Sequence, residues 1–173
     1  MSDLSFRLMN LTFKVVDFFY PYIDKRIQTF GIRDGMTLVD YGCGPGRYTT
    51  RFAWLVGDKG KVYAVDIQEL AIQKVREKVT RMELTNIETV LARGYDSGLP
   101  DEVADMVFAI DMFLGIRNPK VFLGEIKRIV KKDGILVIDD GHQSRRETKR
   151  KIEEAGQWNI IEETKDHLIC KPK

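Results

Sequence analysis

Three glycines at alternate positions, Gly42, Gly44 and Gly46, lie between two segments of different periodicity. Residues 37–39 form a short apolar run typical of a strand, and residues 48–56 have the pattern of a helix. Glycine lets the backbone adopt left-handed conformations and approach a ligand closely. A strand, a glycine-rich turn and a helix in this order therefore predict a ligand site at the helix N-terminus, where unpaired N–H groups are available.

An acidic residue ends the strand that follows. Residues 61–65 read as the second strand, and Asp66 comes directly after them, about twenty residues beyond the glycine loop. A carboxylate at this place can accept hydrogen bonds from both hydroxyls of a ribose, or it can cap the next helix. The loop, the helix and the acid together predict a site for an adenosine-containing cofactor.

The spacing of the glycines distinguishes between such cofactors. A nicotinamide fingerprint needs glycine at the sixth position from Gly42, where this chain has Arg47. The third glycine falls at the fifth position instead, and Asp40 precedes the loop. The resulting pattern, Asp-x-Gly-x-Gly-x-Gly, resembles the first motif of the class I S-adenosylmethionine-dependent methyltransferases.

This resemblance implies S-adenosyl-L-methionine as the cofactor. It implies that Asp40 lies near the methionyl end of the cofactor and that Asp66 binds the hydroxyls of the ribose. Alternatively, Asp40 is a packing acid that fixes the loop. The residues that we expect at the cofactor are Asp40, Gly42, Cys43, Gly44, Gly46, Asp66, Ile67, Tyr95, Asp96 and Asp111.

Residues 94–100 resemble the third motif of the same family, in which an acid contacts the adenine amino group. Tyr95 occupies the usual position of that acid, and Asp96 comes one residue later. The sequence leaves open whether Asp96 or a backbone group contacts adenine. Asp96 is equally suited to an Asx turn, in which its side chain bonds to the backbone two residues on.

Two candidate catalytic residues follow later strands. Asp111 lies in residues 109–115, which resemble the fourth motif, where the family faces the transferred methyl group. It suits a general base, a dipole for the sulfonium or a helix cap. His142 follows the fifth strand, at the same edge of a parallel sheet, and is either a base near neutral pH or an exposed loop residue. We expect the basic helix that follows to neutralise Asp139 and Asp140, and we predict no metal site.

Strands that alternate with helices predict an α/β fold. We expect a Rossmann-like, doubly wound, seven-stranded sheet, mostly parallel, with an antiparallel C-terminal edge hairpin. The predicted strands are residues 37–39, 61–65, 87–91, 104–110, 135–138, 158–162 and 167–170. The predicted helices are residues 48–56, 70–82, 121–130 and 145–155, with residues 131–134 as the basic end and cap of the third.

The predicted catalytic domain covers residues 35–173. Residues 1–34 form an N-terminal helical segment, broken at Pro21, that we expect to act as a lid over the acceptor. Its aromatic residues include Phe13, Phe18, Phe19, Tyr20 and Tyr22.

Composition and charge indicate which kinds of binding partner this chain is suited to. The net charge is only +2, and the basic run at residues 145–151 lacks interleaved aromatic residues, so a small-molecule acceptor is favoured over nucleic acid. No apolar run is long enough to span a membrane, and the N-terminus lacks a signal-peptide pattern. We therefore expect a cytoplasmic protein, and the oligomeric state stays open.

The predicted function is an S-adenosylmethionine-dependent methyltransferase acting on a small, partly apolar acceptor. Two alternatives remain at this point. One is a non-enzymatic partner protein that binds S-adenosylmethionine. The other is a nicotinamide-dependent oxidoreductase, which the position of Arg47 disfavours.

Overall fold

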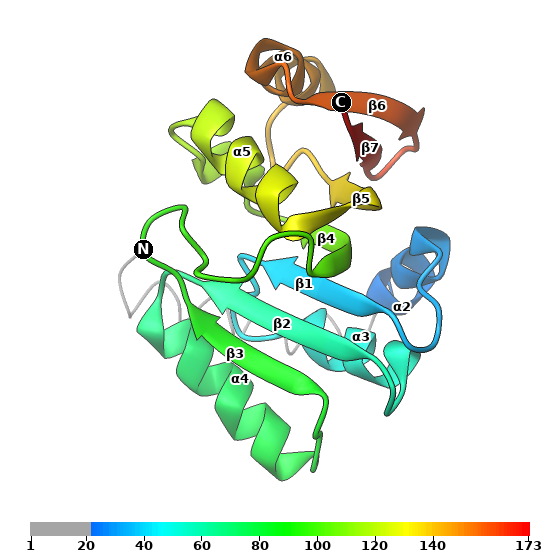
Figure 1. Cartoon of the computed structure of the whole chain (residues 1–173), viewed down its shortest axis with the longest axis vertical. Helices are drawn as coiled ribbons and strands as arrows, with labels where there is room; N and C mark the ends of the chain where they lie inside the picture. The colour runs from blue at the N-terminus through cyan, green and yellow to red at the C-terminus, as the bar shows by residue number, and fades with distance from the viewer. Residues whose placement is uncertain (1–21) are drawn as a thin grey trace.

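The computed structural model describes residues 22–173. In this part of the chain seven strands form one sheet in the order β3-β2-β1-β4-β5-β7-β6 (Figure 1). The pairs from β3 to β5 are parallel, whereas β7 is antiparallel to both β5 and β6. This topology confirms the predicted fold. The strands are β1 (Thr37–Tyr41), β2 (Lys61–Asp66), β3 (Ile87–Leu91), β4 (Ala104–Ala109), β5 (Val130–Ile138), β6 (Trp158–Glu163) and β7 (Leu168–Pro172).

Helices cover both faces of the sheet. They are α2 (Tyr22–Ile27), α3 (Thr49–Val56), α4 (Glu69–Arg81), α5 (Pro119–Ile129) and α6 (Arg145–Ala155), with short 3₁₀ helices η1 (Gln28–Phe30) and η2 (Phe113–Gly115). Successive residues of β1 point to opposite faces. Leu38 packs with the α2 and α3 side, and Val39 with the α5 and α6 side. Both faces are therefore buried, as a parallel sheet requires.

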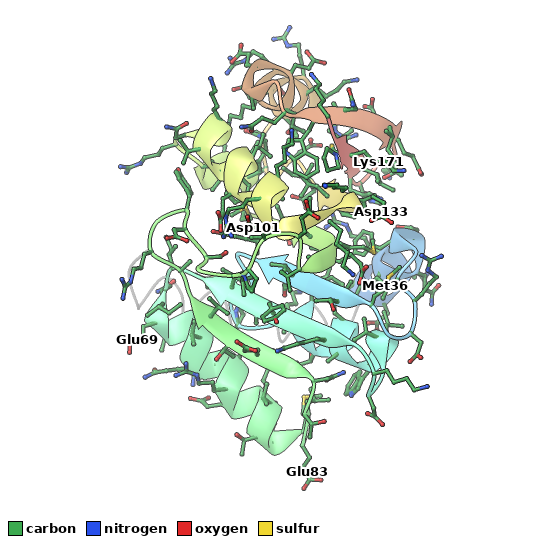
Figure 2. All side chains as sticks on the ribbon, viewed as in Figure 1. Met36, Glu69, Glu83, Asp101, Asp133 and Lys171 are labelled. Carbon is green, nitrogen blue, oxygen red and sulfur yellow. The ribbon has the colours of Figure 1, made fainter. Side chains whose placement is uncertain are left out.

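The direction of α4 locates the carboxyl edge of the sheet. Glu69, its first residue, and Glu83, just past its end, lie at opposite ends of the helix (Figure 2). Because α4 follows β2 and runs back to the start of β3, Glu69 is near the carboxyl edge and Glu83 near the opposite edge. Open α/β sheets bind their ligands at the carboxyl edge.

The described part of the N-terminal segment packs into the core. Ile23, Ile27 and Phe30 are almost fully buried and belong to one apolar cluster with Phe52 and Phe108. Residues 1–21 of the predicted lid lie outside the described residues, as does the side chain of Tyr22. The boundary at residue 35 and the lid stay predictions.

The expected helix end at residues 131–134 is wrong. Helix α5 ends at Ile129, and β5 already begins at Val130. A lysine pair followed by Asp-Gly is typical of a helix C-terminus, but Gly134 serves another purpose here. A Cβ atom at Gly134 would lie 2.8 Å from the carbonyl oxygen of Asp105, so glycine allows β5 to lie close against β4 beside an irregularity in their pairing.

Candidate active site

The three glycines of the loop differ in their surroundings. All have positive φ, with 78° at Gly42, 51° at Gly44 and 74° at Gly46. A Cβ atom at Gly42 would lie 3.1 Å from Met112, and one at Gly46 would lie 3.0 Å from Val75, whereas no atom lies within 4 Å of this position at Gly44. Gly42 and Gly46 thus permit close packing, and Gly44 leaves its backbone accessible.

Asp66 ties the loop to β2. Its Oδ2 accepts a hydrogen bond of 2.9 Å from the N–H of Gly44, and its Oδ1 accepts one of 2.9 Å from the N–H of Gln68. The second bond closes a turn ahead of α4, whose N-cap residue is Gln68, and no side chain caps that helix. Burial raises the pKa of Asp66, although the backbone N–H donors oppose this change.

Asp40 is buried at the carboxyl end of β1, with 3% of its surface exposed. The hydroxyl of Thr49, at the start of α3, donates a hydrogen bond of 2.5 Å to its Oδ2. Burial raises the pKa of Asp40 to about 7, and the nearby charge of Asp66 adds to this effect. The carboxyl group thus fixes the helix that follows the glycine loop, which is the packing role left open by the sequence.

The raised pKa of Asp40 predicts a pH-dependent stability. Between the ordinary value of 3.8 and about 7, the folded chain keeps a proton that the unfolded chain releases, so the free energy of unfolding falls as the pH rises through this window. Urea unfolding at about pH 5 and pH 8 measures this loss. In Asp40→Asn the loss between the two pH values should be smaller. An equal loss in the parent and the variant would contradict the prediction.

Cys43 and Ile67 have opposite exposures. The side chain of Cys43 is buried against Ala64, Ile72 and Val75, and burial raises the pKa of its thiol well above the ordinary value. Ile67 is 66% exposed directly after Asp66. Cys43 is therefore enclosed by the fold, whereas the side chain of Ile67 is available at the surface.

Tyr95 and Asp96 both bond to backbone N–H groups of the chain. The hydroxyl of Tyr95 accepts hydrogen bonds of 3.1 Å from the N–H groups of Arg117 and Asn118, before α5. Asp96 Oδ1 accepts a hydrogen bond of 2.8 Å from the N–H of Gly98, which is the Asx turn considered from the sequence. Their contact with adenine stays a prediction.

The loops after β4 and β5 meet at the carboxyl edge. The N–H of Asp111 donates a hydrogen bond of 2.9 Å to Asp139 Oδ1, and Asp111 has a φ of 58°, which is rare for a residue other than glycine. A Cβ atom at Gly141 would lie 3.3 Å from the backbone nitrogen of Met112. His142, with a φ of 70°, is exposed beside Gly141. Asp111 is also exposed, so its carboxylate is accessible at this rim.

Sequence reasoning missed the buried partner of Asp139. Arg26 of α2 is 6% exposed, and its guanidinium donates hydrogen bonds of 2.8 Å to Asp139 Oδ2, 2.8 Å to the carbonyl oxygen of Asp166 and 3.1 Å to the hydroxyl of Tyr48. The expected partner, the basic helix α6, neutralises Asp140 through Arg145 at 2.9 Å instead. Arg26 thus joins α2 to the end of β5.

A sequence signal for this contact existed. Ile23, Arg26, Ile27 and Phe30 follow the spacing of a single buried helix face, and Arg26 is the one charged residue on it. A buried arginine needs an acidic partner. Burial and the charge of Asp111 raise the pKa of Asp139 to about 6, and Arg26 opposes this change.

Residues 22–173 contain neither a cluster suited to a metal ion nor a helix suited to a membrane. No group of three His, Cys, Asp or Glu side chains is placed to hold a metal ion in this range. None of the helices described there is long and apolar enough to cross a membrane.

The parallel sheet, the glycine loop and the acid that ends β2 define a Rossmann-like methyltransferase that uses S-adenosylmethionine. The chain belongs to the family described as "Methyltransferase domain", whose sequence pattern matches residues 32–169. This assignment confirms the predicted class of enzyme and its cofactor, and it removes the nicotinamide alternative.

Three relatives illustrate the similarity. An S-adenosylmethionine-dependent methyltransferase from Aquifex aeolicus is 30% identical, with a TM-score of 0.77 and 86% of each chain covered. Coclaurine N-methyltransferase, solved with N-methylheliamine and S-adenosylhomocysteine, is 27% identical, with a TM-score of 0.62, over 69% of this chain and 34% of that one. The ubiquinone/menaquinone biosynthesis C-methyltransferase UbiE of Shewanella oneidensis is 26% identical over 78% of this chain and 54% of its own length. The chain thus spans about half the length of the curated relatives that it matches.

Proposed function

We propose that this methyltransferase acts on a ring carbon of a small hydroxyaromatic acceptor such as a hydroquinone. The observation that carries the proposal is the pair of carboxylates at the rim. Asp111 is exposed there, and its backbone N–H donates a hydrogen bond to the buried carboxylate of Asp139. The similarity to a quinone C-methyltransferase supports the same class of acceptor.

We propose that the cofactor binds at the glycine loop. A carboxylate offers about four acceptor positions, so Asp66 can bind the loop N–H of Gly44 and still accept from a ribose hydroxyl. The accessible backbone of Gly44 suits close approach of the cofactor. Asp40 stands at the methionyl end in this arrangement. S-adenosylmethionine supplies a methyl group that is already activated by the positive sulfur.

Replacing Asp66 with alanine should weaken S-adenosylhomocysteine binding by about 1.5–3 kcal/mol, or roughly tenfold to 150-fold, because hydrogen bonds to a charged group are lost. Titration calorimetry on the folded variant measures the change. Glu69→Ala is the matched control, since Glu69 is an exposed acid three residues further on, and it should bind as the parent does. Unchanged affinity in Asp66→Ala would remove Asp66 from the site.

The acceptor end requires proton removal. A hydroquinone becomes a strong carbon nucleophile when one hydroxyl loses its proton, because the oxygen charge spreads to the neighbouring ring carbon. Asp111 is the base that we propose for this proton. The ring carbon then forms the bond to the methyl carbon as the carbon–sulfur bond breaks and S-adenosylhomocysteine leaves. The C–H proton at that carbon passes to water, and its electron pair restores the aromatic ring.

Product analysis tests the acceptor class. The enzyme is incubated with S-adenosylmethionine and 1,4-naphthohydroquinone, an aromatic amine or an RNA oligonucleotide, and S-adenosylhomocysteine release is measured. We expect release with the hydroquinone and a new carbon-bound methyl group by NMR. Methylation of its oxygen, or release with only the amine or the RNA, would overturn the acceptor proposal and leave the family assignment intact.

A further inference from the structure

A large groove lies away from the rim, on the face covered by α2, α3 and α4. Its volume is about 800 Å³. Its apolar lining includes Ile27 of α2, Ile32 after η1, Trp54 and Leu55 of α3, and Met82 after α4. None of the residues with an expected role in the methyl transfer lines it.

Helix α3 is apolar on two faces, and only one of them is buried by the described residues. Phe52 and Val56 point into the core, whereas Trp54 is 60% and Leu55 46% exposed. The outer face of a surface helix is normally polar, and a helix that is hydrophobic all round is a buried one. Arg51, the basic residue of this face, pairs with Asp24 of α2. The composition of α3 therefore indicates that something covers the groove.

The segment before α2 has the pattern of a matching occupant. Its charged and amide residues recur at helical spacing and define one polar row, formed by Asp3, Arg7, Asn10, Lys14 and Asp17. Two apolar rows flank it on a helix. The first consists of Leu4, Leu8, Leu11, Val15 and Phe18, and the second of Phe6, Met9, Phe13, Val16 and Tyr20. Such a helix can bury most of its circumference and keep one polar row in water.

We propose that residues 3–20 form a helix that docks in the groove of α2, α3 and α4 through its apolar rows. An 18-residue helix is about 27 Å long, enough to cross a helix layer, because each residue adds about 1.5 Å. The segment ends at Pro21, beside α2, whose Asp24 and Ile27 line the groove. Pro21 permits the chain to turn between the two helices. Docked here, the segment covers Trp54 and Leu55 rather than the ends of β4 and β5, where a lid would lie.

Site-specific photocrosslinking in the full chain tests the proposal. Leu55 is replaced with p-benzoylphenylalanine, and the irradiated monomer is digested with trypsin. We expect a crosslink within one chain to the segment 3–20, for which the tryptic peptide of residues 8–14 is diagnostic. The same photoreactive residue at Val121, which is 52% exposed on α5 at the opposite face of the sheet, should give no such crosslink.

Charge substitutions supply matched variants. Leu11→Asp and Phe13→Asp should each lower the crosslink yield severalfold, because each places a charge in an apolar row. Asn10→Asp adds the same charge to the polar row and should leave the yield unchanged. Retained S-adenosylhomocysteine binding shows that each variant is folded. If a variant fails to fold, the parent crosslink decides alone.

Three results would overturn the proposal. The first is the absence of any crosslink from position 55. The second is a crosslink that joins two copies, which makes the groove an interface between chains. The third is a crosslink to lipid when anionic vesicles are added, without the intramolecular product, which makes it a membrane surface.

Discussion

Replacing Asp111 with asparagine is expected to lower methyl transfer to the hydroquinone by about 10²–10⁴-fold, the usual effect of removing a general base. Asparagine keeps the size of the side chain and leaves the backbone N–H for Asp139. The affinity for S-adenosylhomocysteine should stay within roughly threefold, since the loss concerns the chemical step. Single-turnover rates and calorimetry on the same preparation measure the two quantities.

Two neighbouring variants separate the candidate bases. His142→Ala tests the second candidate, and we rank it below Asp111, because the loop after the fourth strand faces the methyl group in this family. Asp140→Asn is the control, since Asp140 lies on the same rim but is paired with Arg145. If Asp111→Asn keeps full activity while His142→Ala loses it, the base is His142. If both retain activity, neither residue removes a proton in the limiting step.

Replacing Arg26 with methionine should destabilise the folded chain by about 3–5 kcal/mol, because the carboxylate of Asp139 would remain buried without its partner. For a chain of this size, the melting temperature should fall by roughly 6–20 °C. Thermal unfolding followed by circular dichroism measures the shift. Both side chains are buried, with exposures of 5% and 6%, so water screens the attraction between their charges only slightly.

A matched exposed pair provides the control for Arg26. Arg51→Met breaks the ion pair with Asp24, whose side chain is 54% exposed, and should cost within about 1 kcal/mol. Adding Asp139→Asn to Arg26→Met should restore part of the stability, because the uncompensated charge is removed. Equal effects of Arg26→Met and Arg51→Met would show that burial of the pair contributes little.

Local patterns explain why much of this fold was predictable. The loop around Gly44 and the acid at Asp66 lie within one strand–helix–strand unit of the sequence, and their spacing predicts the type of cofactor site. The bounds of β3 and α6 were predicted to the residue, because Gly156 ends α6 and the apolar run of β3 is short and clear. Residues 92–103, between β3 and β4, contain no helix, as their polar and glycine-rich composition indicates.

Contacts between distant residues explain the rest. Arg26 and Asp139 are 113 positions apart, so no local pattern joins them. The start of β5 was misjudged because Lys131 reads as a helix end, whereas in the fold it pairs with Asp105 of the neighbouring strand. Tyr95 stands where the family has an acid, and its hydroxyl binds the chain before α5, a contact that depends on tertiary structure.

The contacts of Arg26 also bear on how the chain folds as it is made. Asp166, whose carbonyl group accepts from Arg26, lies 140 residues later, so α2 leaves the ribosome long before its partners exist. At about 5–20 residues per second, that interval is roughly 7–28 s. During this interval the apolar and charged face of α2 lacks its native neighbours, first those in β5 and the β6–β7 turn and then, once β5 is made, those in the turn. The first described helix is consequently among the last to complete its native contacts during translation.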